Sequence, residues 1–105
     1  MQLHQIKYFL LLCEERSFTR AARRCRIAQP SLTKAIRALE ADLGGQLFRR
    51  KPYIELSELG RAVQPHLEEI ATAAEKARHA ASAVADPGRD DADEASAVST
   101  RGALV

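Results

Sequence analysis

The sequence predicts a mainly α-helical fold with three short helices and a small β wing, followed by one long helix. Apolar residues recur at intervals of three and four along residues 4–15, 18–25, 29–43 and 58–84, which is the period of an α-helix with one buried face. Between the last two of these segments, a proline separates two short apolar runs, as expected for a β-hairpin.

Residues that start or stop helices mark the ends of these segments. Ser17 is a suitable N-cap for the second helix, and Pro30 falls in the first turn of the third, where its missing N–H costs no hydrogen bond. The third helix is expected to end at Gly44 and Gly45. Its buried stripe is expected to consist of Leu32, Ala35, Ile36, Leu39 and Leu43.

The second half of the chain changes character twice. Residues 47–56 are predicted to form the wing, and Ser57 is expected to cap a long helix that Pro65 should kink. From Asp86 onward the chain is acidic and rich in serine and alanine, with too little apolar content to pack. We therefore expect three regions, which are a winged helix-turn-helix domain over residues 1–58, a linker or dimerisation helix over 59–85 and a disordered tail over 86–105.

Length and composition exclude several classes of protein. The 105 residues allow one small domain and an appendage, so an enzyme with a buried cleft is not expected. None of His4, His66 and His79 has a serine, cysteine or acid at a catalytic spacing. The longest apolar run covers residues 8–13, against about 20 needed to cross a bilayer. Without a signal-peptide pattern, a cytoplasmic protein with no membrane contact is expected.

The two cysteines and the charges give weaker signals. Cys13 and Cys25 fall at periodic apolar positions and are expected to be buried thiols, with a disulfide or a metal site as the alternative, so we expect no metal and no cofactor. Residues 1–60 carry 11 basic and 6 acidic residues, whereas residues 61–105 carry 5 and 8. A basic first half favours an anionic partner, although an ordinary solvated surface would carry the same charges.

The second and third helices, joined by the short turn at 26–28, match a helix-turn-helix over about residues 18–37. The second helix of such a motif enters the major groove of DNA. On a projection at 100° per residue, the positions opposite the apolar stripe or on its flanks are polar, cationic or proline, and no acid occurs across residues 25–37. This pattern predicts DNA contacts rather than an ordinary solvated face. The positions are Pro30, Ser31, Thr33, Lys34 and Arg37.

Further basic residues surround this helix. Of the arginines at 20, 23, 24 and 26, we expect Arg20 and Arg23 to contact phosphates and at least one of the four to pair with Glu14 or Glu15. In the wing, Lys51 is the better candidate for a groove contact. Arg50 is expected either to contact phosphate or to anchor the hairpin.

Together these residues resemble the N-terminal domain of LysR-type transcriptional regulators. The resemblance covers residues 1–60 almost continuously and extends weakly to about residue 85. The matching positions are Phe9, Ser17, Phe18, Thr19, Ala21, Ala22, Gln29, Pro30, Ser31, Leu32, Thr33, Ile36, Leu39, Glu40, Leu43, Gly44, Leu47, Phe48, Arg50, Leu56, Ser57 and Gly60. It implies a bacterial, sequence-specific regulator that acts as a dimer or tetramer. It also implies that Gln29 joins the five positions above at the DNA interface.

Several positions depart from the family pattern. Cys25 replaces the usual leucine, and Ala28 replaces a serine that often caps the recognition helix, at a cost of about 1 kcal/mol. The wing is shorter than usual. Tyr53 lies near the position where the family tends to have an arginine that contacts the minor groove, so we include Tyr53 among the DNA contacts. The family normally continues into a two-lobed effector domain. We expect this chain to lack it and to hold no effector site, as a truncated product, a gene fragment or a stand-alone domain.

The long helix carries an apolar repeat with alternating spacings of four and three, which is a coiled-coil register. The repeat consists of Val63, Leu67, Ile70, Ala74, Ala77, Ala81 and Val84. It predicts a weak homodimer on an inverted-repeat DNA site, although the stripe could instead pack on its own domain. The alternative function is a protein-interaction module that dimerises with a full-length relative and inhibits it.

Overall fold

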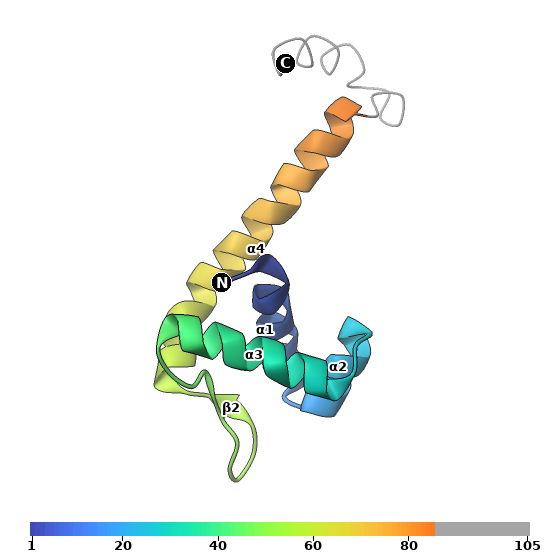
Figure 1. Ribbon diagram of the computed structural model, residues 1–105. Helices are drawn as coiled ribbons and strands as arrows, with labels where there is room; N and C mark the ends of the chain where they lie inside the picture. Colours follow the sequence, from blue (N-terminus) through green and yellow to red (C-terminus); the bar gives the residue numbers. More distant parts are fainter. Residues whose placement is uncertain (86–105) are drawn as a thin grey trace. The chain divides into compact units, whose positions relative to one another are not determined.

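The computed structural model describes residues 1–85, whose path is shown in Figure 1. Its elements in chain order are α1 (Leu3–Glu15), α2 (Phe18–Cys25), α3 (Gln29–Leu43), β1 (Phe48–Arg49), β2 (Glu55–Leu56) and α4 (Glu58–Ala85). The predicted winged, mainly α-helical fold is therefore confirmed. The tail predicted over residues 86–105 lies outside the described residues.

The chain divides into two units, Met1–Ala71 and a second that begins at Thr72. The first contains α1, α2, α3, the hairpin and the beginning of α4. It extends beyond residue 58 because Leu59, Val63 and Leu67 of α4 pack on its core. In the second unit, the structure describes the rest of α4, up to Ala85.

The core of the first unit lies where α1, α2 and α3 each contact the other two. The hairpin joins this core through Phe48, whose ring centroid lies 5.4 Å from that of Phe9 on α1. Apolar side chains from every helix and from the hairpin are removed from water here, which is the main force that holds so small a domain together. The buried set includes Ile6, Phe9, Leu12, Ala21, Ala22, Leu32, Ile36, Leu39, Leu47, Phe48 and Leu67.

The predicted helix ends are confirmed. Ser17 caps α2, because its Oγ accepts a hydrogen bond from the backbone N–H of Arg20 at 3.1 Å. At the end of α3, Gly44 adopts a left-handed conformation with φ of 91°, and the N–H groups of Gly44 and Gly45 both donate to the carbonyl of Glu40. Both backbone N–H groups are thus hydrogen-bonded at the point where the chain leaves the helix.

The hairpin pairs β1 with β2 in antiparallel register, with Phe48 opposite Leu56 and Arg49 opposite Glu55. The second pair also forms an ion pair across the strands, with Arg49 Nη2 3.1 Å from Glu55 Oε2. A two-stranded hairpin is unstable alone in water, so its position depends on Phe48 and on its connections to α3 and α4.

The start of α4 is fixed against residue 47. Ser57 donates its backbone N–H to the carbonyl of Leu47 at 2.9 Å, and its Oγ accepts the N–H of Gly60 at 2.9 Å, which confirms it as a cap. Gly60 lies so close that a Cβ atom there would stand 2.2 Å from the Leu47 oxygen. From this point α4 continues through Pro65 to Ala85.

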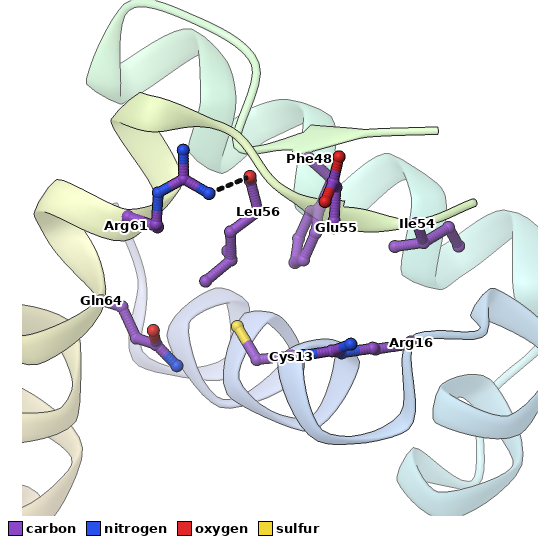
Figure 2. Close-up of a pocket in the computed structure, with 8 residues that line it drawn as sticks. All are labelled: Cys13, Arg16, Phe48, Ile54, Glu55, Leu56, Arg61 and Gln64. Atoms are coloured by element: carbon purple, nitrogen blue, oxygen red, sulfur yellow. Dashed lines mark hydrogen bonds between the residues drawn. The ribbon is translucent and has the colours of Figure 1, made fainter. Parts of the chain in front are cut away.

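A cavity of about 260 Å³ lies between α1, the hairpin and the first turns of α4 (Figure 2). Figure 2 shows the sulfur of Cys13 pointing from α1 toward the hairpin, below Leu56, whose carbonyl accepts a hydrogen bond from Arg61. Burial raises the pKa of the Cys13 thiol to about 12, and the charges of Glu68 and Glu14 add to this shift. Cys25 is also a free thiol whose pKa is raised by burial.

Residues 1–85 contain no helix that is both long and apolar enough to span a membrane. The same residues contain no cluster of histidine, cysteine or acidic side chains that could hold a metal ion.

We expect Gly60→Ala to destabilise the first unit. The added methyl group would overlap the Leu47 carbonyl, and relief requires α4 to shift, so the free energy of unfolding should fall by about 2 kcal/mol. Urea denaturation measures this change. Gly44→Asn is the matched control, because no atom lies within 4 Å of a Cβ at Gly44 and asparagine tolerates its left-handed backbone. Equal stability of Gly60→Ala and wild type would contradict the tight contact.

We also expect Cys13 to resist thiol reagents. With a pKa of about 12, rather than the ordinary value of 9.0, the reactive thiolate is roughly a thousandfold rarer at pH 8. Labelling of the folded chain followed by mass spectrometry should find Cys25 modified before Cys13, and the difference should disappear in denaturant. Equal labelling rates in the folded chain would contradict the raised pKa of the half-buried Cys13 thiol.

Candidate nucleic-acid interface

Helix α3 has two chemically distinct faces. Leu32, Ile36 and Leu39 have no exposed surface. Lys34 and Arg37 are exposed, and neither forms an ion pair within residues 1–85. Because the two faces belong to one rigid helix, burial of the first holds the second in solvent.

The structure brings the six predicted α3 contacts together within Gln29–Arg37 of the helix. Five of them are exposed, whereas Thr33 is half-buried beside the apolar stripe. Ala28 provides no side-chain cap, and the N–H groups of Ser31 and Leu32 donate to its carbonyl. The exposed set is Gln29, Pro30, Ser31, Lys34 and Arg37.

The arginines of α2 and of its C-cap divide into two pairs. Arg24 Nη1 lies 2.7 Å from Glu14 Oε1 and 2.9 Å from Glu15 Oε2. Arg20 donates to the Glu15 backbone carbonyl at 2.6 Å and lies 3.3 Å from its carboxylate. The hydrogen bond from Arg24 lowers the pKa of Glu15, and Arg20 adds to the shift. The expectation that at least one arginine pairs with these acids is confirmed for two of them.

The other pair, Arg23 and Arg26, is exposed and forms no ion pair in the described part of the chain. Arg26 ends α2 in a left-handed conformation with φ of 60° and begins the turn to α3. No acidic residue occurs in the sequence between Glu15 and Glu40, so α2, the turn and most of α3 form a continuous basic segment.

One side-chain contact joins α2 to the first residue of α3. The hydroxyl of Thr19 donates to the amide oxygen of Gln29 at 3.1 Å. Arg23 follows Thr19 by one helical turn and therefore lies on the same side of α2, beside the beginning of α3. Arg20 and Arg24 lie toward α1, where their glutamate partners are.

The wing presents two exposed residues and one anchored residue. Lys51 and Tyr53 lie between β1 and β2, and Tyr53 is 64% exposed. The guanidinium of Arg50 lies over the ring of Phe18 on α2, 4.8 Å from its centroid. A cation over an aromatic face is an attractive contact. This contact supports the anchoring role of Arg50.

A shallow groove of about 280 Å³ runs between α1 and α3 beside Lys34. His4 and Tyr8 of α1 and Ser31 of α3 line this groove. The rings of His4 and Tyr8 meet edge to face at a centroid distance of 5.5 Å. This groove, the hydrogen bond from Thr19 and the exposure of Arg26 were not predicted from the sequence. The four-residue spacing of Thr19 and Arg23 was a sequence signal that these two side chains share one face of α2.

The same combination of elements occurs in known regulators. The chain is 43% identical over 74 residues to the HTH-type transcriptional regulator IlvR of Caulobacter vibrioides. This alignment covers 70% of the chain and 25% of the relative. It is 44% identical over 63 residues to the HTH-type transcriptional regulator BudR of Klebsiella aerogenes, which covers 59% of this chain and 44% of that protein. The chain thus spans less than half the length of these relatives.

Two solved structures show the same fold. CbnR, a LysR family transcriptional regulator, is similar over 80% of this chain and 29% of its own, with a TM-score of 0.74 and 34% identity. The DNA-binding domain of BenM, in a complex with catB site 1 DNA, is similar over 84% of this chain and 96% of its own, with a TM-score of 0.76 and 29% identity.

The family model of bacterial regulatory helix-turn-helix proteins of the lysR family matches residues 3–61, which is more than half of the chain. This match includes α1, α2, α3, the wing and the start of α4. The chain therefore belongs to the lysR family of bacterial helix-turn-helix regulatory proteins.

Proposed function

We propose that the chain is a sequence-specific, DNA-binding transcriptional regulator that places α3 in the major groove. The observation that carries this proposal is the exposed, unpaired cationic face of α3 above a fully buried stripe. The DNA complex of the BenM domain, which has the same fold, supports it. We propose no catalytic role. We propose a cytoplasmic location, because the proposed partner is DNA.

The side chains are assigned to two kinds of contact. Those of α3, from Gln29 to Arg37, face the base edges, with Lys34 and Arg37 able to donate to guanine or to phosphate. Arg23 on α2 and Arg26 in the turn that follows it are the phosphate contacts, since Arg20 is engaged with Glu15. Lys51 and Tyr53 reach the flanking minor groove, and Arg50 anchors the wing on Phe18.

We further propose that two copies assemble through α4 on an inverted repeat. Leu67 is 2% exposed and belongs to the core of its own domain, against which Val63 also packs, so neither offers much surface to a partner. The proposed contact therefore begins at Ile70, which is 41% exposed. It continues along the same register through Ala74, Ala77, Ala81 and Val84.

No small-molecule effector site is proposed within residues 1–85. The alternative, an inhibitor that dimerises with a full-length relative, uses the same α4 stripe and differs in requiring no DNA binding by this chain alone.

Lys34→Ala and Arg37→Ala should each weaken binding to a duplex selected from a random-sequence pool, without lowering the midpoint of thermal unfolding. Loss of a good base contact is worth about 1–3 kcal/mol. Wild-type affinity should fall steeply with salt, with each phosphate contact adding about 0.9 to the slope of log K against log salt. Gel shift and fluorescence anisotropy of the purified chain measure both effects.

Arg24→Ala is the matched control, because it removes one positive charge that is already paired with Glu14 and Glu15. Its effect on affinity should be smaller than that of Arg37→Ala. A flat salt response, or equal losses for the two arginines, would contradict the proposed interface. A wild-type chain that binds no duplex would favour the inhibitor.

Ile70→Asp should weaken cooperative binding to an inverted repeat while leaving binding to a single half-site unchanged. The charge would lie in the proposed apolar seam, where burying it without a partner is unfavourable. Thr72→Asp adds the same charge outside the seam at an exposed position and is the control. Sedimentation over a concentration series, with and without duplex, measures assembly. Equal binding of half-site and full repeat by wild type would exclude the dimer.

A further inference from the structure

The hydrogen bond between Thr19 and Gln29 lies at the beginning of the proposed recognition helix. Thr19 is the second residue of α2 and Gln29 is the first residue of α3. The Thr19 hydroxyl donates to Oε1 of Gln29 at 3.1 Å, and both side chains are exposed. The contact therefore lies outside the core, so its consequence concerns the orientation of the Gln29 amide.

The backbone of Gln29 is already fixed. It follows Ala28, which is extended at φ −70° and ψ 146°, and it precedes Pro30 within the first turn of α3. The remaining freedom of Gln29 is in its side-chain torsions, which in glutamine are numerous. The bond from Thr19 restrains these torsions before any ligand arrives, and such preorganisation lowers the cost of binding.

The direction of the bond decides which chemical group Gln29 presents. Its oxygen is turned toward α2, so its Nε2 hydrogens point away from Thr19 and are available as donors. In the major groove, purine N7, guanine O6 and thymine O4 are acceptors, whereas cytosine offers the N4 amino donor. An amide held in this orientation would find partners on the first group and none on a cytosine of the strand that it contacts.

We propose that Thr19 is a positioning residue that orients Gln29 as a hydrogen-bond donor and so excludes cytosine at one base position in each half-site. This inference rests on the proposed function. Thr19 itself contacts no base. Without its hydroxyl, the Gln29 amide can rotate to present oxygen or nitrogen, and the preference at that position relaxes.

Selection from a random-sequence duplex pool, followed by sequencing, tests the proposal with Thr19→Val and Thr19→Ser. Valine keeps the branched shape and removes the hydroxyl, whereas serine keeps the hydroxyl. In Thr19→Val, the discrimination against cytosine at one position should fall about fivefold, because one neutral hydrogen bond is worth about that factor. The preferences at other positions and the slope of affinity against salt should not change. Thr19→Ser should retain the wild-type preference.

Gln29→Leu should lose the preference at the same position, and adding Thr19→Val to it should change nothing more. Nuclear magnetic resonance of the free chain should show the Gln29 side-chain amide becoming more mobile in Thr19→Val. A wild-type motif that Thr19→Val selects unchanged, or an equal loss of affinity for all sequences, would overturn this inference alone. A wild-type chain that enriches no motif would overturn the proposed function with it.

Discussion

Burial of the apolar stripe of α3 is the constraint on which the candidate interface depends. Leu32, Ile36 and Leu39 are fully enclosed by α1, α2 and the hairpin, so α3 cannot rotate about its axis without exposing them. A rotation that hid Lys34 or Arg37 would bury a charge that has no partner, which is strongly unfavourable. The hydrophobic effect therefore orients the cationic face of α3 toward solvent, and no polar contact is needed to hold it there.

Residue 47 plays a comparable role for the wing. Its N–H donates to the carboxylate of Glu40 at 2.8 Å, and its carbonyl accepts from Ser57 and lies against Gly60. One peptide segment thus connects the end of α3, the hairpin and the start of α4. Since Leu47 is itself fully buried, these connections are shielded from water, and the wing inherits its position from the same core that orients α3.

The sequence predicted what depends on local pattern and failed where packing decides. Helical period, Ser17, Ser57 and Gly44 act within a few residues, so α1, α2, α3 and their ends could be predicted. Which arginines of α2 remain unpaired depends on where Glu14 and Glu15 of α1 come to lie, and this follows from tertiary packing. The apolar repeat of α4 equally fits a core or a dimer seam, and only the structure shows that Leu67 belongs to the core.

The change of role along α4 has a thermodynamic consequence. In the proposed dimer, two of the four bulky apolar residues of the repeat, Val63 and Leu67, already stabilise the folded domain, and three of the five positions left are alanines, each of which buries little area. Two half-sites on one duplex would hold two chains near each other and raise their effective concentration, so a contact too weak to assemble free chains can operate on DNA. By linkage, the same weak contact would favour a paired site over an isolated one, which places the discrimination between operators partly in α4.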